Sequence, residues 1–78
     1  MPPGAVKHGT MANAKLIHDT QTGVVGKLAS LGCDRPGDID RYVLTMPSGA
    51  PGRKTWKELW IVSGCNQKYP ITIEFAES

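Results

Sequence analysis

Residues 56–75, WKELWIVSGCNQKYPITIEF, decide how this chain folds. Two runs rich in aromatic and β-branched residues flank a polar joint that contains Gly64, and this pattern is typical of a β-hairpin. Both tryptophans, the only phenylalanine and the second cysteine lie in this stretch. The sequence therefore predicts two antiparallel strands, Trp56–Val62 and Tyr69–Ala76.

Two registers are open to this hairpin, and a slip of one residue would exchange the two faces of a strand. A five-residue loop places Glu58 opposite Glu74, whereas a four-residue loop, Cys65–Lys68, avoids this like-charged pair. We favour the four-residue loop because it also buries Trp56 and Trp60. Glu58 then shares the side of the tryptophans, and we expect it to lie at the end of the sheet and reach solvent or a cation.

The favoured register leaves an apolar strip on the opposite face of the sheet. Leu59 and Ile61 point to that face, and we expect them beside Val43 of the neighbouring strand. An apolar sheet face that is rimmed by charge commonly marks an interface. Val43, Leu59 and Ile61 are therefore the predicted partner surface, through which the chain would form a homodimer or bind another protein.

A helix is predicted before the sheet. Apolar residues recur there at spacings of three and four, which forms one stripe: Leu16, Ile17, Thr20, Val24, Leu28 and Leu31. Asn13 is a candidate N-cap, and two internal glycines weaken the first part, so the pattern defines the helix best over residues 22–31. Gly32 suits a left-handed C-cap, and Cys33 follows directly.

The residues between the helix and the hairpin admit two interpretations. Residues 39–46 have apolar positions at helical spacing, but 42–45 is a compact run of strand formers. We prefer a strand, because an isolated two-stranded hairpin is marginal and needs a third strand. Residues 34–38 then form a turn and 47–54 a flexible loop. Pro70, which has no backbone N–H, indicates either that the last strand lies at an edge or that Pro70 is among its first paired residues.

Together these segments predict an α+β fold, an N-terminal helix packed on a three-stranded antiparallel β-meander. The 78 residues allow one small domain, which we place at residues 13–78. Residues 1–12 show no period, and we expect a disordered tail or an added leader in place of a removed signal. No apolar run approaches the roughly 18 residues that a membrane span needs.

Cys33 and Cys65 are the strongest chemical hint in the sequence. One ends the helix and the other lies in the hairpin loop, so a helix packed on the sheet could bring them together. The bridge would stabilise the fold by about 3 to 4 kcal/mol in the chain-entropy model. We predict a disulfide on condition that the protein is exported. In a reducing cytosol the pair would be two unrelated thiols.

The sequence predicts no enzyme, cofactor or metal site. His8 and His18 match no metal-ligand spacing with the cysteines. A continuous helix would also hold His18 about 22 Å from Cys33, too far for a nucleophile and its base. Residues 49–55 resemble a phosphate-binding loop but lack the glycine directly before Lys54, and a strand follows them instead of a helix.

The charge distribution argues against a nucleic-acid partner. The formal net charge is +2 and the nine cations are scattered along the chain. Arg53, Lys54 and Lys57, beside Trp56, are the candidate basic patch. If this patch is a binding surface, the alternative function is a cytosolic module that binds nucleic acid or another anionic ligand. Core packing explains the tryptophans better.

Three short motifs follow one another along the chain: Leu31-Gly-Cys33 at the helix end, Trp60-x-Val-x-Gly-Cys65, and Tyr69-x-Ile-x-Ile-x-Phe75. Their order resembles small exported or lipoprotein-type bacterial domains of unknown function. The resemblance covers residues 24–75. It implies a periplasmic or exported location, with a cytoplasmic one as the alternative, and a Cys33–Cys65 bridge. The favoured function is a non-enzymatic envelope domain that binds a partner or itself.

Overall fold

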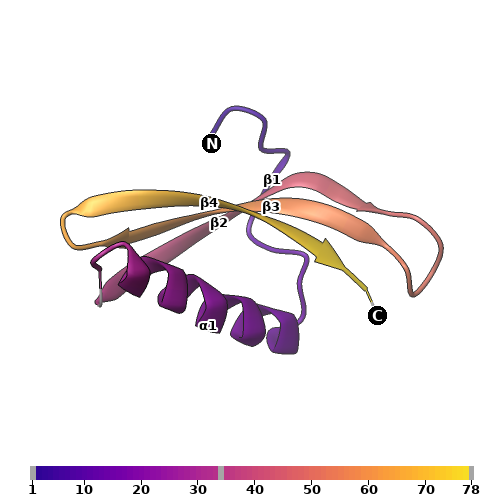
Figure 1. Ribbon diagram of the computed structural model, residues 1–78. Helices are drawn as coiled ribbons and strands as arrows, with labels where there is room; N and C mark the ends of the chain where they lie inside the picture. Colours follow the sequence, from indigo (N-terminus) through magenta and orange to yellow (C-terminus); the bar gives the residue numbers. More distant parts are fainter. Residues whose placement is uncertain (1, 34, 78) are drawn as a thin grey trace.

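The computed structural model describes residues 2–33 and 35–77 and shows one helix on one antiparallel sheet. The helix is α1 (Ala14–Ser30), and the strands follow the order β1-β2-β3-β4. Their bounds are β1 Lys7–His8, β2 Pro36–Ser48, β3 Thr55–Gly64 and β4 Gln67–Ala76. α1 covers one face of the sheet, and the N-terminal segment rises on the opposite side (Figure 1). Within the described ranges, no helix is long and apolar enough to cross a membrane.

The expected three-stranded meander is wrong, because β1 adds a fourth strand beside β2. Val6 and Gly9, on either side of this two-residue strand, donate backbone hydrogen bonds to the carbonyls of Val43 and Arg41. β1 lies within residues 1–12, which we expected to be disordered. A strand of two residues has no side-chain alternation to detect, and its pairing is made by the backbone alone.

The predicted helix is confirmed at both ends. The Asn13 side chain accepts a hydrogen bond from the backbone N–H of Leu16 at 2.8 Å, as an N-cap does. Gly32 adopts a φ of +94°, and the N–H of Cys33 donates to the carbonyl of Leu28 at 2.9 Å. The helix therefore ends by placing Cys33, which is fully buried, next to the sheet.

β2 confirms the strand interpretation of residues 39–46. The turn expected at 34–38 is wrong where it is described, because β2 already begins at Pro36; residue 34 itself lies outside the described residues. Glycine allows this close pairing: a Cβ on Gly37 would lie 2.9 Å from the Ser63 carbonyl oxygen. At its other end β2 extends to Ser48, into the predicted loop.

The β3–β4 hairpin has a two-residue turn in place of the expected four-residue loop. Gly64 pairs with Gln67, and both Cys65 and Asn66 have a positive φ, 51° and 61°, as a type I′ turn requires. The pairing is therefore shifted by two residues from the one we favoured. A shift of two residues keeps the faces of the strands. Both tryptophans accordingly face α1, as predicted.

The core lies between α1 and the sheet. Its buried members are Val24, Leu28, Cys33, Trp56, Trp60, Val62 and Phe75. Trp56 stacks on Phe75 with ring centroids 5.2 Å apart, so the prediction that the tryptophans are core residues is confirmed. The Cys33–Cys65 disulfide, also predicted, joins the end of α1 to the hairpin turn across a Cα–Cα distance of 5.8 Å.

Candidate functional site

Glu58 is a carboxylate with no exposed surface in the middle of β3. Strand alternation places it on the same face as Trp56 and Trp60, toward the helix. Charged side chains are almost never fully buried without partners. Our expectation that Glu58 lies at the end of the sheet and reaches solvent or a cation is therefore wrong.

The Glu58 carboxylate is held by four donors, two of them from the tryptophans beside it. The indole N–H groups of Trp56 and Trp60 donate to Oε2 and Oε1, each at 2.8 Å. The backbone N–H of Met11 donates to Oε2 at 2.9 Å, and the Thr10 hydroxyl lies 2.6 and 2.8 Å from the two oxygens. In the part of the chain that the structure describes, no cation forms an ion pair with this group. The donors that bond to it directly are all neutral.

The hydrogen bonds decide the protonation state of Glu58. Burial raises its pKa, but the donors Thr10, Trp60, Met11 and Trp56 together lower it further, and the net pKa lies below the ordinary value. The carboxylate is thus ionised at neutral pH and remains hydrogen-bonded to its donors. This state suits a structural anchor for residues 10–11 and does not suit a general acid or base.

Acidification should therefore destabilise the protein through Glu58. Because its folded pKa lies below the unfolded value of about 4.3, the stabilisation is complete above that pH and is lost as the pH falls through the folded pKa. Urea unfolding between pH 7 and pH 3, with a carboxyl-carbon NMR titration of Glu58, measures both quantities. The Glu74→Gln variant should lose stability on acidification in the same way, and a Glu58 midpoint above the unfolded value of about 4.3 would contradict the assignment.

Arg41 adds a cation next to this anchor. Its guanidinium lies over the Trp60 ring, 4.5 Å from the centroid, in the geometry of a cation–π contact. It also donates to the Gln21 side chain of α1 at 3.2 Å. Arg41 thus links the helix to the tryptophan that binds Glu58.

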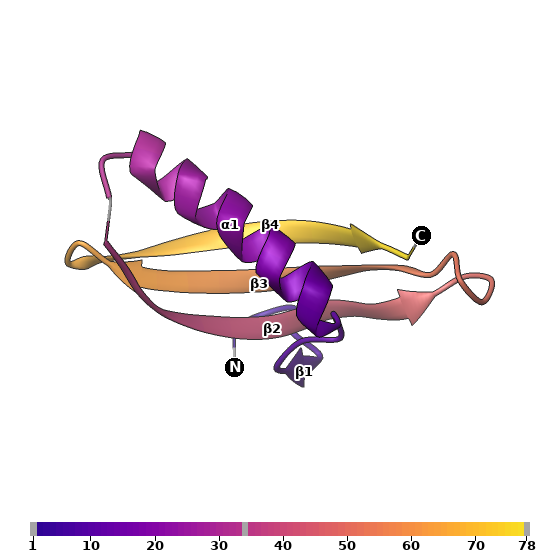
Figure 2. The same ribbon diagram turned by 90° about the horizontal axis from the view of Figure 1, so that it is seen from below.

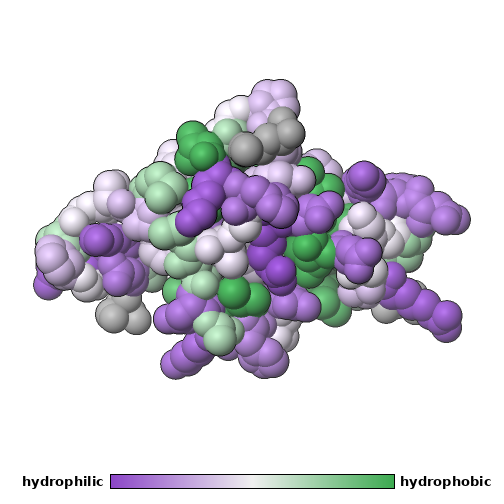
Figure 3. All heavy atoms as spheres, turned by 180° about the vertical axis from the view of Figure 1, so that it is seen from behind, coloured by the Kyte–Doolittle hydropathy of each residue, from purple (hydrophilic) through white to green (hydrophobic). Residues whose placement is uncertain are grey.

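The predicted partner surface is not brought together by the structure. Val43 is fully buried and pairs with Glu58, on the face toward α1. Leu59 and Ile61 are half-buried on the opposite face, where Tyr42 pairs with Leu59. The N-terminal segment rises on that side (Figure 1). Seen from behind, with the sheet edge-on, hydrophobic and hydrophilic residues are mixed over the surface (Figure 3).

The candidate basic patch is exposed, but its charges are partly occupied. Arg53 and Lys54 lie in the β2–β3 loop, and Lys57 lies on β3 with its Nζ 3.6 Å from a carboxylate oxygen of Glu74. Trp56, the aromatic residue beside the patch, is only 5% exposed. It therefore cannot offer the open ring face on which a nucleic-acid base would stack.

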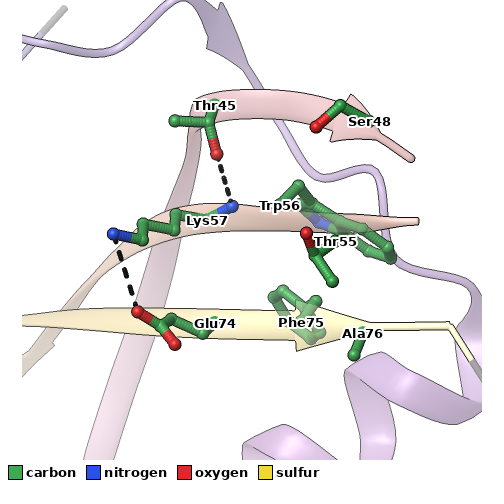
Figure 4. Close-up of a pocket in the computed structure, with 8 residues that line it drawn as sticks. All are labelled: Thr45, Ser48, Thr55, Trp56, Lys57, Glu74, Phe75 and Ala76. Carbon is green, nitrogen blue, oxygen red and sulfur yellow. Dashed lines mark hydrogen bonds and ion pairs between the residues drawn. The ribbon is translucent and has the colours of Figure 1, made fainter. Parts of the chain in front are cut away.

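A hollow of about 540 Å³ lies beside Lys57, between the ends of β2, β3 and β4 (Figure 4). Three of its polar residues are engaged with one another: the Lys57 backbone N–H donates to the Thr45 hydroxyl at 2.8 Å, and Lys57 pairs with Glu74. Trp56 and Phe75 also line it, although both are largely buried. We assign it no ligand.

β4 is an edge strand, as Pro70 predicted, and it pairs only with β3 in the described part of the chain. Ten consecutive residue pairs join the two strands without a register shift. β4 therefore has a long, regular free edge. The edge position could be predicted from Pro70. The length of the paired edge could not, because the expected hairpin register differs from the observed one by two residues.

No family model, curated protein sequence or solved structure matches this chain. Its function is inferred from its own geometry.

Proposed function

We propose that this chain is a non-enzymatic binding domain of the cell envelope or the extracellular space, which acts by binding another polypeptide. The observation that carries this proposal is the free edge of β4. A regular edge strand presents a row of backbone donors and acceptors that a further strand can pair with.

The use of its reactive side chains supports a binding role over catalysis. Cys33 and Cys65 are joined in a disulfide, so neither offers a free thiolate. Glu58 is fully hydrogen-bonded and has a lowered pKa. These groups, which could have carried chemistry, hold the fold together instead.

The disulfide also supports an exported location, since such bonds persist in oxidising compartments and are reduced in most cytosols. The resemblance to small exported bacterial domains agrees with this. The alternative cytosolic module has less support, because Trp56 is buried and Lys57 is paired with Glu74.

Two measurements test the proposal. Protein taken from its own cells under alkylating conditions should gain no alkyl groups until it is reduced, and panning of the oxidised protein against displayed random peptides should recover binders. Reduced, urea-unfolded protein is the control and should recover none of them. Two alkylated thiols in the untreated protein would contradict export. Failure to recover any peptide on the folded domain would contradict a binding role.

A further inference from the structure

We infer that an extended peptide binds along the free edge of β4 and becomes a fifth strand of the sheet. The C-terminal end of α1, which projects past this edge, would cover the peptide. The inference rests on the proposed function, because it names the partner as a single strand in which apolar and polar residues alternate.

The alternation of the hydrogen-bond ladder decides which backbone N–H and C=O groups of β4 point away from β3. The N–H of Glu77 donates to the carbonyl of Lys54 at 2.9 Å, which continues the β3–β4 register. Bonded and non-bonded pairs alternate in an antiparallel ladder, so the odd-numbered residues of β4 bond to β3. The N–H and C=O groups of Thr72, Glu74 and Ala76 therefore point to the free edge. They form a set of consecutive donors and acceptors.

Pro70 fits the same phase. It pairs with Ile61 at a non-bonded position, so its nitrogen, which carries no hydrogen, faces the free edge and removes no bond to β3. A strand that pairs with β4 therefore lacks one hydrogen bond, because Pro70 has no N–H to donate. This restricts non-specific association but leaves the Thr72–Ala76 half open.

The other edge of the sheet is protected much more strongly. β1 covers the middle of β2, and the β2–β3 pairing contains three register shifts. Pro36 and Pro47 lie near the two ends of β2. Bulges, prolines and covering segments are the usual protection of edge strands, and β4 has only Pro70 and its charged side chains.

The end of α1 extends past the uncovered edge (Figure 2). Leu31 belongs to the apolar stripe of Val24 and Leu28, which are buried, yet it is 59% exposed. An apolar stripe is expected to have a sheet beneath it. A strand added to β4 would supply that surface and bury Leu31.

The inner side of β4 leads to the same conclusion. Tyr69, Ile71 and Ile73 face α1 but are only half-buried. Alternate apolar residues of an added strand would lie beside them and beneath the helix end, because successive side chains point to opposite faces. The apolar half of the peptide is thereby specified.

The outer side of β4 specifies the polar half. Lys68 and Glu74 are exposed there, with Thr72 between them. Glu74 pairs with Lys57 through one carboxylate oxygen, so its other oxygen is the one that would accept from the peptide. An antiparallel peptide complementary to them carries a cation opposite Glu74 and, six residues later, a carboxylate opposite Lys68. A second copy of the chain fits less well: paired through β4 about a two-fold axis, it would bring its own α1 to the same face, where each helix already projects over the shared edge.

The test uses a capped peptide, Thr-Lys-Val-Thr-Val-Thr-Val-Glu-Thr, with its N-methylated form as the backbone control. Titration into the ¹⁵N-labelled, oxidised protein should shift the amide signals of Thr72, Glu74 and Ala76 and slow their hydrogen exchange. The N-methylated peptide should bind about tenfold more weakly, since it loses edge hydrogen bonds. The inference would be overturned if the amide protons of Thr72 and Glu74 were already protected from hydrogen exchange in the free protein.

Thr72→Pro removes the first of the three free-edge donors, the one nearest Pro70, and Thr72→Val is the matched control that keeps it. We expect Thr72→Pro to weaken peptide binding about tenfold at unchanged disulfide content, and Thr72→Val to bind within about twofold of the original protein. Leu31→Ser should also weaken binding, because it removes the projecting apolar contact.

Failure of the inference and failure of the proposed function give different results. If panned peptides bind the domain but neither Thr72→Pro nor Leu31→Ser weakens them, the binding role stands and the β4 site is overturned. A dimer in sedimentation that Thr72→Pro dissociates would overturn the choice of occupant in favour of a second copy. If neither the designed peptide nor any panned peptide binds the folded domain, both proposals fail.

Discussion

Replacing Glu58 with glutamine should lower the free energy of unfolding by about 3 kcal/mol or more. Four donors converge on the carboxylate, from Thr10, Met11, Trp56 and Trp60. A glutamine amide keeps one oxygen and turns its NH₂ toward N–H groups that can only donate. Each buried donor left without an acceptor costs about 1 to 3 kcal/mol. For a chain of this length the whole stability is about 4 to 12 kcal/mol.

Urea unfolding followed by tryptophan fluorescence measures this loss directly, because both tryptophans bind the substituted side chain. Glu74→Gln is the matched control: its carboxylate is exposed and only pairs with Lys57, so we expect a change below about 1 kcal/mol. Hydrogen exchange should also show that residues 10–11 lose protection in Glu58→Gln. A variant within about 1 kcal/mol of the original protein would show that the anchor is unimportant.

The parts of the fold that the sequence could predict are those set by local chemistry. The helix follows from its apolar spacing, the Asn13 cap and Gly32, all within α1 and its neighbours. The strands follow from composition, and the faces of β3 follow from alternation. The register that we favoured is wrong by two residues because only four- and five-residue loops were compared, and a two-residue turn at Cys65 and Asn66 needs a positive φ that residues other than glycine rarely adopt. In the structure Gly64 ends β3, and Cys65 and Asn66 adopt the left-handed conformation.

The Glu58 anchor depends on contacts between residues 47 and 48 positions apart, so no local pattern predicts it. Thr10 and Met11 lie in a stretch without periodicity, and only the folded chain brings them to β3. One signal was available. A glutamate between two tryptophans on the buried side needs donors, and each tryptophan has one to give.

Glu58 and the disulfide hold opposite ends of the same element. Glu58 binds Thr10 and Met11, which lead into α1, whereas Cys65 binds Cys33 just after α1 ends. The helix crosses the sheet diagonally between these two attachments (Figure 2). The attachment at Cys33 keeps the projecting end of α1 over the β4 edge, so the disulfide bears on the proposed peptide site as well as on stability.

The double variant Cys33→Ser/Cys65→Ser should lose about 3 to 4 kcal/mol, because the bridge closes a loop of 32 residues and limits the unfolded chain. In a domain of this size that loss lowers the melting temperature by about 15 °C or more. Asn66→Gly is the matched control: it changes the same turn, tolerates the φ of 61°, and keeps the bridge.

Thermal unfolding of the oxidised, reduced and double-serine proteins measures this effect. We expect the reduced and double-serine forms to agree with each other, both well below the oxidised form and Asn66→Gly. Peptide binding by the double-serine protein, measured below its melting temperature, should fall as well, because the end of α1 loses its attachment to the hairpin turn. Equal melting temperatures for the oxidised and reduced proteins would show that the disulfide is not needed, and that the Glu58 anchor and packing around Val24 and Leu28 hold the helix on the sheet.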